Sequence, residues 1–254
     1  MNNRKEQIQA FERLLDIMDE LREKCPWDRK QTMESLRTLT IEEVYELSDA
    51  ILEKDSLEIK KELGDVFMHL VFYAKIAAEN NSFDVADVLN SVCDKLIHRH
   101  PHIYGETTVN SEEEVLQNWE QIKLKEGNTS VLSGVPSSLP AMVKAYRIQD
   151  KVKGVGFEFE NANQVFDKIQ EEILEFKKEE NPSDREMEFG DILFSMINYG
   201  RFVGINSEDA LERSNKKFIH RFQKLEEIAK EKGYILGEIP LNELDNLWDL
   251  AKIR

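Results

Sequence analysis

The chain carries one acidic pattern twice, and this internal repeat constrains its fold more than any other feature. The first copy reads EExxE over residues 42–46 and then ExGD over residues 62–65. The second copy reads EExxE over residues 171–175 and then ExGD over residues 188–191. The two copies are offset by 129 residues at the first motif and by 126 at the second. Recurrence in the same order and at nearly the same spacing predicts a duplicated unit of about 100 residues.

Two weaker signals downstream of the acidic motifs recur as well. The segment KLIHR at residues 95–99 matches KFIHR at residues 217–221, at an offset of 122 residues. Trp119 and the acid after it match Trp248 and the acid after it, at an offset of 129 residues. The repeat therefore extends over both halves of the chain.

The repeated unit is expected to be helical. Apolar residues recur at helical spacing, as in Ile8, Phe11, Leu15 and Met18, and no segment shows sustained alternation of apolar and polar residues. The 254 residues include only 11 glycines and 6 prolines, too few turn residues for a β-sandwich or a propeller. We therefore predict an all-α fold made of two tandem helical bundles.

One stretch rich in Gly, Ser, Thr and Pro separates the two halves. It reads GNTSVLSGVPSSLP over residues 127–140 and predicts a linker. The predicted domains are therefore residues 1–126 and residues 141–254.

The sequence also predicts where several helices begin. Thr40, followed three residues later by Glu43, has the spacing of a capping box and predicts the start of a helix. Asp55 or Ser56 is expected to start the next helix, and Asp84 the one after it.

Charge and cysteine content exclude several classes of function. The formal net charge is −16, so the chain repels phosphate backbones and anionic lipids, and we expect neither nucleic-acid nor membrane binding. The first residues contain no apolar segment of the signal-peptide kind. Two cysteines cannot form a disulfide framework, and a cytoplasmic location is the expectation.

The acidic motifs have the spacing of a metal site. Residues three and four apart share one face of a helix, so EExxE and ExGD on neighbouring helices would aim several carboxylates at one point. Such a cluster is unfavourable unless cations lie between the carboxylates. Oxygen ligands of this kind favour Mg²⁺, with Mn²⁺ as the expected substitute. A glycine costs about 1 kcal/mol inside a helix, so its presence in both copies predicts a close approach by the partner helix.

Each signal also has an ordinary structural interpretation. In a chain with 50 acidic residues, a single EExxE is usually a solvated helix face. Lys217 and Arg221 could form a surface pair, and Trp248 could be a packing residue. His69 is expected in the core, and the histidines of residues 98–102 lack the spacing of a metal site on a helix. Only the repetition of the paired acidic motifs favours a functional interpretation.

Taken together, these motifs resemble the MazG family of nucleoside triphosphate pyrophosphohydrolases. The resemblance includes CPWDRKQT at residues 25–32, ELGD at 62–65, RHPH at 99–102 and SLPA at 138–141, and it covers nearly the whole chain in order. It implies an all-α fold related to the dimeric dUTPases, a homodimer and dependence on Mg²⁺. It also implies hydrolysis of NTPs, ATP included, and of dNTPs to the monophosphate and pyrophosphate.

Motifs and resemblance together give a set of expected site residues. The expected metal ligands of the second half are Glu171, Glu172, Glu175, Glu188 and Asp191, with Glu172 and Glu175 as the candidate catalytic residues. The second-ranked set in the first half is Glu42, Glu43, Glu46, Glu62 and Asp65. The expected substrate-binding residues are Lys168, Arg185, Lys217, Arg221 and Trp248, with Lys95, Arg99 and Trp119 second-ranked in the first half. Which glutamate acts as general base stays open.

Neighbouring residues favour the second half as the main active site. Lys168 precedes its EExxE motif by three residues and Arg185 precedes its ExGD motif by three, whereas the first half has Leu39 and Ile59 there. Two extra cations would help to bind a triphosphate. The competing interpretation is that both cations are solvated and that both halves are active.

Two other functions remain open at this stage. One is a narrower enzyme, similar to a dUTPase or a dCTPase, that prefers a single nucleotide. The other is an acidic helical scaffold or binding protein whose carboxylates are merely solvated.

Overall fold

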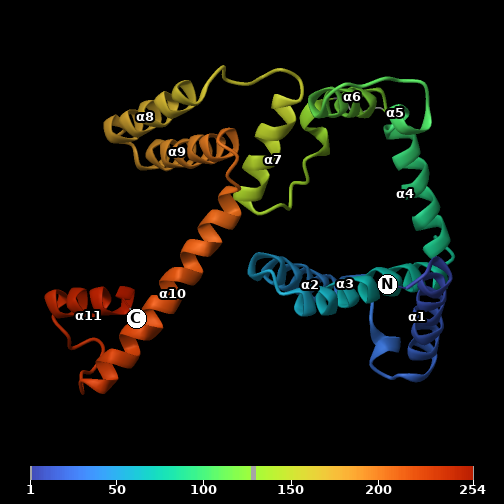
Figure 1. Ribbon diagram of the computed structural model, residues 1–254, viewed down its shortest axis with the longest axis horizontal. Helices are drawn as coiled ribbons and strands as arrows, with labels where there is room; N and C mark the ends of the chain where they lie inside the picture. Colours follow the sequence, from blue (N-terminus) through green and yellow to red (C-terminus); the bar gives the residue numbers. More distant parts are fainter. Residues whose placement is uncertain (1, 127–129, 254) are drawn as a thin grey trace. The chain divides into compact units, whose positions relative to one another are not determined.

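The computed structural model describes residues 2–126 and 130–253, and all regular elements within them are helices, as predicted (Figure 1). The helices are α1 (Arg4–Lys24), η1 (Asp28–Lys30), α2 (Met33–Glu53), α3 (Ser56–Glu79), α4 (Val85–Arg99), α5 (Pro101–Tyr104), α6 (Glu112–Lys125), η2 (Val131–Gly134), α7 (Ala141–Lys153), α8 (Ala162–Lys178), α9 (Pro182–Phe202), α10 (Ser207–Glu231) and α11 (Leu241–Ile253). Within the described ranges, none of these helices has both the length and the apolar character needed to cross a bilayer.

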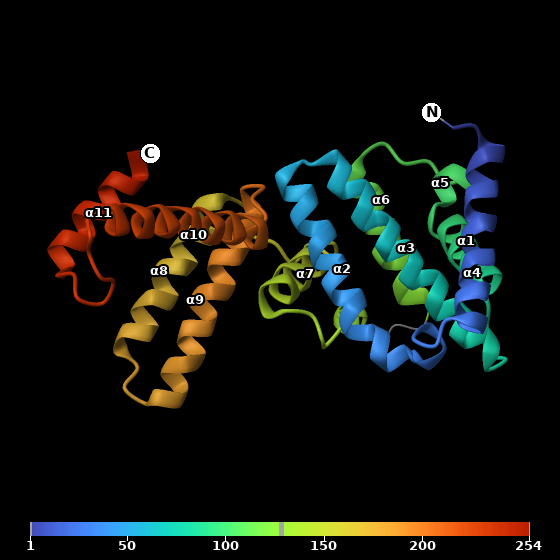
Figure 2. The same cartoon turned by 90° about the horizontal axis from the view of Figure 1, so that it is seen from below.

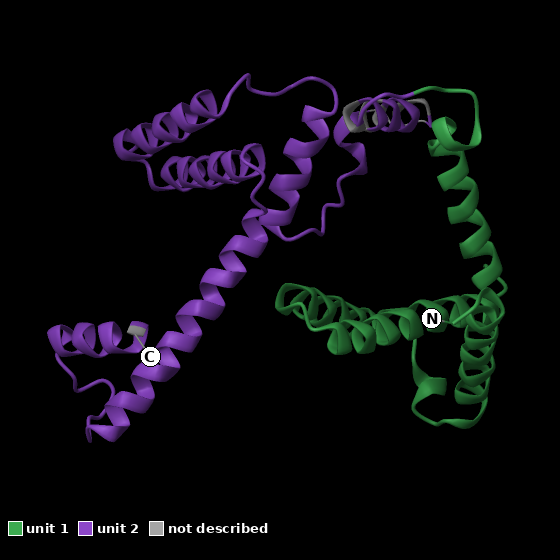
Figure 3. Ribbon diagram, viewed as in Figure 1, with its two compact units in different colours: residues 1–108 green, residues 109–254 purple. Residues whose placement is uncertain are grey.

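The chain divides into two compact units, residues 1–108 and residues 109–254 (Figure 3). This division lies ahead of the predicted linker, so α6 belongs to the second unit. The later part of the linker is held by that unit, because Lys151 Nζ donates a hydrogen bond to the Val131 carbonyl at 2.9 Å. The predicted domain limits at residues 126 and 141 stay a prediction.

The first unit is built around the α2–α3 hairpin. These two helices lie side by side and antiparallel (Figure 2), and α1 packs against α3. The chain turns between α2 and α3 at Lys54, whose φ of 57° places it in the left-handed region. The core consists of buried side chains from α1, α2 and α3, namely Met18, Leu36, Val71, Phe72 and Ile76.

The start of α2 differs from the prediction. The helix begins at Met33, and its N-cap is Thr32, whose side chain accepts a hydrogen bond from the Ser35 amide. The prediction that Thr40 caps this helix is wrong, because Thr40 lies in its interior and donates its hydroxyl to the Leu36 carbonyl at 3.0 Å. The predicted caps at Asp55 and Asp84 are confirmed.

The second unit contains an equivalent hairpin, α8–α9. Asn161 caps α8, and Pro182 at the first turn of α9 supplies the fixed φ that suits a helix start. Helix α7 packs against α9, and α11 packs on the later part of α10. A separate apolar cluster holds α10 and α11 together, with Leu225, Ile228 and Leu247 at its centre.

Candidate metal centre

Each hairpin brings three carboxylates of the repeated motifs together. In the first unit these are Glu43 of α2 with Glu62 and Asp65 of α3; in the second they are Glu172 of α8 with Glu188 and Asp191 of α9. In each group, one oxygen of every carboxylate lies within 4.8 Å of the others. We call these groups the first cluster and the second cluster. The geometry therefore confirms that EExxE and ExGD meet across two packed helices.

The first cluster includes a carboxylate oxygen that is buried without a partner. Glu62 is 3% exposed, and its Oε1 accepts a hydrogen bond from Lys61 Nζ at 2.7 Å. Its Oε2 has no hydrogen-bond partner among the described residues. Burial raises the pKa of the Glu43 carboxyl, and the nearby charges of Asp65 and other acids raise it further. A cation held among these oxygens would remove both penalties.

The second cluster has a lysine on its rim. Lys168 Nζ donates a hydrogen bond to Glu171 at 3.0 Å and lies 2.8 Å from Oε1 of Glu172, which is 6% exposed. Hydrogen bonds to these two carboxylates raise the pKa of Lys168, which therefore stays charged. Desolvation raises the pKa of the Glu188 carboxyl, and the charge of Glu175 raises it further.

The remaining acids of the EExxE motifs lie around the clusters. Glu46 and Glu175 are near enough for their charges to raise the pKa values of Glu43 and Glu188, respectively. Glu42 exerts a weaker effect of the same kind on Glu43. None of these three, nor Glu171, belongs to the groups of three carboxylates.

Gly64 and Gly190 do not mark a close approach within the chain. A Cβ atom built at either glycine has nothing within 4 Å among the described atoms. The predicted approach by the partner helix of the hairpin is therefore wrong for a single chain.

The second cluster opens into a cavity of about 530 Å³. Its lining includes Lys168, Glu172 and Asp191, together with residues of α7, of α9 and of the segment between α7 and α8. The aromatic rings of Phe157, Phe159 and Phe194 contribute to the wall. A cavity of this size falls in the range of small-molecule sites, about 300–1,000 Å³.

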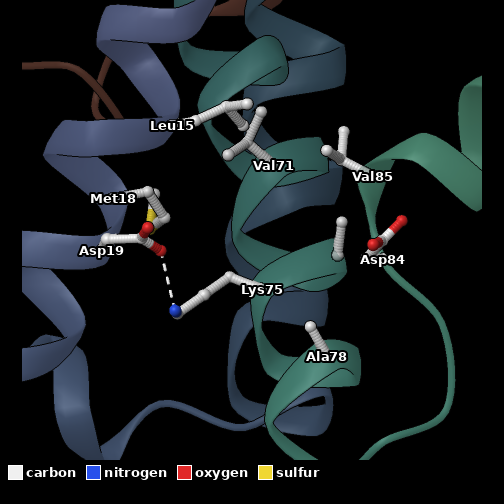
Figure 4. Close-up of a pocket in the computed structure, with 9 residues that line it drawn as sticks. Leu15, Met18, Asp19, Val71, Lys75, Ala78, Asp84 and Val85 are labelled. Atoms are coloured by element: carbon white, nitrogen blue, oxygen red, sulfur yellow. Dashed lines mark ion pairs between the residues drawn. The ribbon is translucent and has the colours of Figure 1, made fainter.

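A smaller cavity of about 190 Å³ lies in the first unit, away from the first cluster (Figure 4). Val71 and Lys75 of α3 lie on its wall opposite Leu15 and Asp19 of α1, and Lys75 Nζ lies 2.7 Å from the Asp19 carboxylate. No carboxylate of the first cluster lines this cavity.

Four expected substrate-binding residues of the second unit lie outside the lining of the larger cavity. The guanidinium of Arg185 stacks over the Phe176 ring at 4.8 Å from its centroid. Trp248 packs against Phe218 with ring centroids 5.1 Å apart. Lys217 and Arg221 lie on α10, whose axis leads away from the α8–α9 hairpin (Figure 1). Their role toward a substrate stays a prediction.

The second-ranked residues are spread over both units. Lys95 and Arg99 lie near the end of α4 in the first unit. Trp119 lies on α6 in the second unit, and Lys123 Nζ lies 5.5 Å from the centroid of its ring. The substrate-binding role of these three residues also stays a prediction.

Lys61 reduces the predicted difference in flanking cations between the two halves. Leu39 and Ile59 are half-buried apolar residues, as expected, but Lys61 contacts Glu62 in the first cluster. Each cluster therefore has one lysine in contact with a buried glutamate. The clearer difference between the units is that the larger cavity is lined by carboxylates of the second cluster, whereas the smaller cavity is not lined by the first cluster.

Sequence reasoning missed several polar residues around the two sites. In the first unit, the Thr40 hydroxyl lies 3.1 Å from His69 Nδ1 and 2.7 Å from the Tyr73 hydroxyl. His69 is 3% exposed, as predicted for a core histidine, and burial lowers its pKa. In the second unit, Gln149 and Arg201 line the larger cavity. No sequence signal pointed to Gln149 or Arg201, because a polar residue on an amphipathic helix is normally expected to face solvent.

Carboxylates that meet across neighbouring helices are a usual way for helical proteins to hold metal ions. The family model described as the MazG nucleotide pyrophosphohydrolase domain matches residues 31–104, which include α2, α3 and the first cluster. The chain is 42% identical over 247 residues to the nucleoside triphosphate pyrophosphohydrolase/pyrophosphatase MazG of Thermotoga maritima, covering 95% of each protein. It is 38% identical over 257 residues to the nucleoside triphosphate pyrophosphohydrolase of Escherichia coli K12, covering 96% of this chain and 98% of that protein. The chain therefore belongs to the MazG family of nucleotide pyrophosphohydrolases.

One solved structure also matches part of the chain. A MazG-related protein from Thermotoga maritima matches 44% of this chain over 98% of its own length, at 30% identity and a TM-score of 0.41.

Proposed function

We propose that this protein is a Mg²⁺-dependent nucleoside triphosphate pyrophosphohydrolase that cleaves between the α- and β-phosphates. Its products would be the nucleoside monophosphate and pyrophosphate. The observation that carries the proposal is the cavity of about 530 Å³ whose wall includes two carboxylates of the second cluster and Lys168. The names and identities of the relatives support the same activity.

The second cluster has the donors that a hard divalent ion prefers. Glu172, Glu188 and Asp191 would hold the ion, with Glu171 and Glu175 as the other proposed ligands. Bound Mg²⁺ would neutralise phosphate charge and make water a better nucleophile. Without a cation, desolvation raises the pKa of the Glu188 carboxyl, and the charges of Glu175 and Asp191 raise it further.

The chain's own residues would supply charge and proton transfer. Lys168 is placed to move from Glu171 and Glu172 to a phosphate oxygen, because its amine lies at the edge of the cavity. Glu172 or Glu175 would accept the proton of the attacking water. We propose that Arg185, Lys217 and Arg221 bind phosphate and that Trp248 packs against the nucleoside from outside the cavity, on its sugar.

We further propose that the second unit carries the main active site and that the protein acts as a homodimer. The position of the larger cavity supports the first statement, because its lining reaches the second cluster, whereas the smaller cavity is not lined by the first. In the first unit, Glu42, Glu43, Glu46, Glu62 and Asp65 would form a second-ranked site.

Product analysis tests the reaction. The purified full-length protein is incubated with a panel of NTPs and dNTPs and Mg²⁺, with Mn²⁺, and with excess EDTA. We expect pyrophosphate and monophosphate with either metal, and no turnover with EDTA. Orthophosphate as the primary product, or full activity in EDTA, would contradict the proposal. Turnover of a single nucleotide would favour the narrower dUTPase-like or dCTPase-like enzyme.

Paired variants test which unit is active. One variant carries Glu172→Ala with Glu175→Ala, and its matched control carries Glu43→Ala with Glu46→Ala. We expect the first variant to lose nearly all kcat and the second to keep most of it. The opposite result would assign the reaction to the first unit, and a loss of about half in each would show two active sites.

A further inference from the structure

The larger cavity contains polar groups that phosphate and metal chemistry do not use. Gln149 of α7 and Arg201 of α9 line its wall, on the same cavity as Glu172 and Asp191. Each carries a buried polar atom that has no hydrogen-bond partner within residues 2–126 and 130–253. These two atoms are an acceptor and a donor.

The acceptor belongs to Gln149, a residue that is 3% exposed. Its Nε2 donates a hydrogen bond to the Phe194 carbonyl at 2.8 Å, which fixes the orientation of the amide. Its Oε1 is left buried without a donor in the described part of the chain. A buried carbonyl oxygen in this state costs roughly 1–3 kcal/mol until a donor reaches it.

The donor belongs to Arg201, whose side chain is 6% exposed. One terminal nitrogen donates to both oxygens of Glu158, at 2.6 and 2.8 Å, and to Asn198 Oδ1 at 2.9 Å. These bonds hold the guanidinium in place, and its Nε has no acceptor among the described residues. The ion pair with Glu158 also neutralises the charge of the Arg201 guanidinium. Arg201 is therefore suited to donate one hydrogen bond from Nε and is not suited to bind an anion.

Helix α9 links these groups to the second cluster. Asp191, Phe194, Asn198 and Arg201 follow one another at spacings of three and four residues and therefore share one helix face. This face carries, in order, the Asp191 carboxylate, the Phe194 ring and the unpaired Nε of Arg201. A ligand with its phosphates at Asp191 would place its other end near Asn198 and Arg201.

A nucleobase matches the chemistry of this end of the cavity. It is a flat aromatic group that can stack on phenylalanine rings, and its edge offers a hydrogen-bond donor next to an acceptor. A phosphate would leave the aromatic wall unused. We infer that Gln149 and Arg201 bind the edge of the nucleobase, Gln149 Oε1 accepting from the base and Arg201 Nε donating to it. This inference rests on the proposed function, since it takes the ligand to be a nucleoside triphosphate.

The test compares NTP kinetics with binding of a phosphate chain that has no base. Gln149→Leu removes the acceptor, and Arg201→Lys keeps a charge beside Glu158 but removes the Nε donor. For the best NTP in the panel, we expect each variant to raise KM about tenfold, equivalent to one lost hydrogen bond of about 1.4 kcal/mol, with a smaller change in kcat. Inhibition by tripolyphosphate, which has no base, should stay at the wild-type level. Gln170→Leu, at an exposed position of α8, is the matched control and should behave as wild type.

Several results would overturn the inference. A wild-type KM in both folded variants would show that the base does not contact these groups. An equal loss of tripolyphosphate inhibition would show a general structural defect. If Gln149→Leu fails to fold by circular dichroism, Arg201→Lys and Gln149→Asn provide the same comparison. If the wild type releases no pyrophosphate, the proposed function is wrong. The base contact is then tested separately, by calorimetric binding of the NTP to the wild type and to the same variants.

Discussion

At the scale of single residues, we predict that Lys168 binds a phosphate of the substrate. It contacts Glu171 and Glu172 and lines the cavity, while Lys177 on the same helix is exposed and does not line it. Charge-assisted hydrogen bonds contribute about 1.5–3 kcal/mol, so Lys168→Met should lower kcat/KM about 10- to 100-fold. Lys177→Met should leave kcat/KM within about twofold of the wild-type value, because Lys177 lies on the surface and substitutions at such positions have small effects. Steady-state kinetics decide this, and equal values for the two variants would refute the role of Lys168.

The two motif glycines give a prediction about stability. Because nothing lies within 4 Å of a Cβ built at Gly64 or Gly190, alanine fits at both positions in a single chain. Alanine has the higher helix propensity, so each variant should be more stable by about 0.5–1 kcal/mol. Urea unfolding followed by circular dichroism measures the change. Destabilisation by Gly190→Ala but not by Gly64→Ala would mean that a second molecule occupies the space beside Gly190.

The residues of the candidate site were predictable only in part. The repeated motifs identified every carboxylate of both clusters, because helical spacing alone places them on a common face. Their spacing could not show which acids of EExxE would face the partner helix, and Glu171 instead binds Lys168. Gln149 could not be predicted either, since a polar residue on an amphipathic helix is normally taken to face solvent.

At the scale of helices, local capping chemistry made most boundaries predictable. Asp84 forms a capping box with Asp87, and the predicted start near Asp55 is confirmed. Thr40 misled the prediction because its spacing to Glu43 imitates a capping box. Its hydroxyl instead satisfies a core contact with His69 and Tyr73, which no local pattern could reveal.

An ion pair between α1 and α3 gives a pH-dependent prediction. Arg22 Nε donates to Glu79 at 2.9 Å, and this contact lowers the pKa of the Glu79 carboxyl below its ordinary value of 4.5. A carboxyl with a lowered folded-state pKa stabilises the folded state above pH 4.5, and the stabilisation is lost as the pH falls through the folded-state pKa. Glu79 is 37% exposed, so solvent screening limits the effect to about 0.5–1 kcal/mol.

Glu79→Gln tests this ion pair. At neutral pH the variant should be less stable than wild type by that amount, and the difference should close as the pH falls below 4.5. Glu12→Gln, which makes the same charge change at an exposed position of α1, is the control and should show no such closure. Urea unfolding at a series of pH values measures both. A difference between Glu79→Gln and wild type that does not change with pH would contradict the assignment.

At the scale of the whole molecule, the repeat predicted two hairpins with equivalent clusters, and both are present. It could not predict that the larger of the two described cavities is lined by the second cluster, because a cavity depends on how α7 and the segment after it pack on α9. The tandem duplication itself, and the relation to the dimeric dUTPases, stay predictions.

Equivalent positions of the two hairpins also expose apolar side chains. Leu63, Phe67 and Leu70 of α3 are 43%, 53% and 55% exposed, and their counterparts on α9 follow the same pattern. Those counterparts are Phe189, Leu193 and Met196, which are 51%, 44% and 54% exposed. Exposed apolar stripes of this kind are typical of surfaces that a second protein covers.

We expect these stripes to be buried in a homodimer. Light scattering of the full-length protein at micromolar concentration should give the mass of two chains. Leu193→Glu with Met196→Glu should shift the protein toward the monomer, because burying two carboxylates in an apolar contact is strongly unfavourable. Gln170→Glu with Gln223→Glu adds the same charge at exposed polar positions and should leave the dimer intact. A monomeric wild type would contradict the prediction, and the apolar stripes would then need another partner.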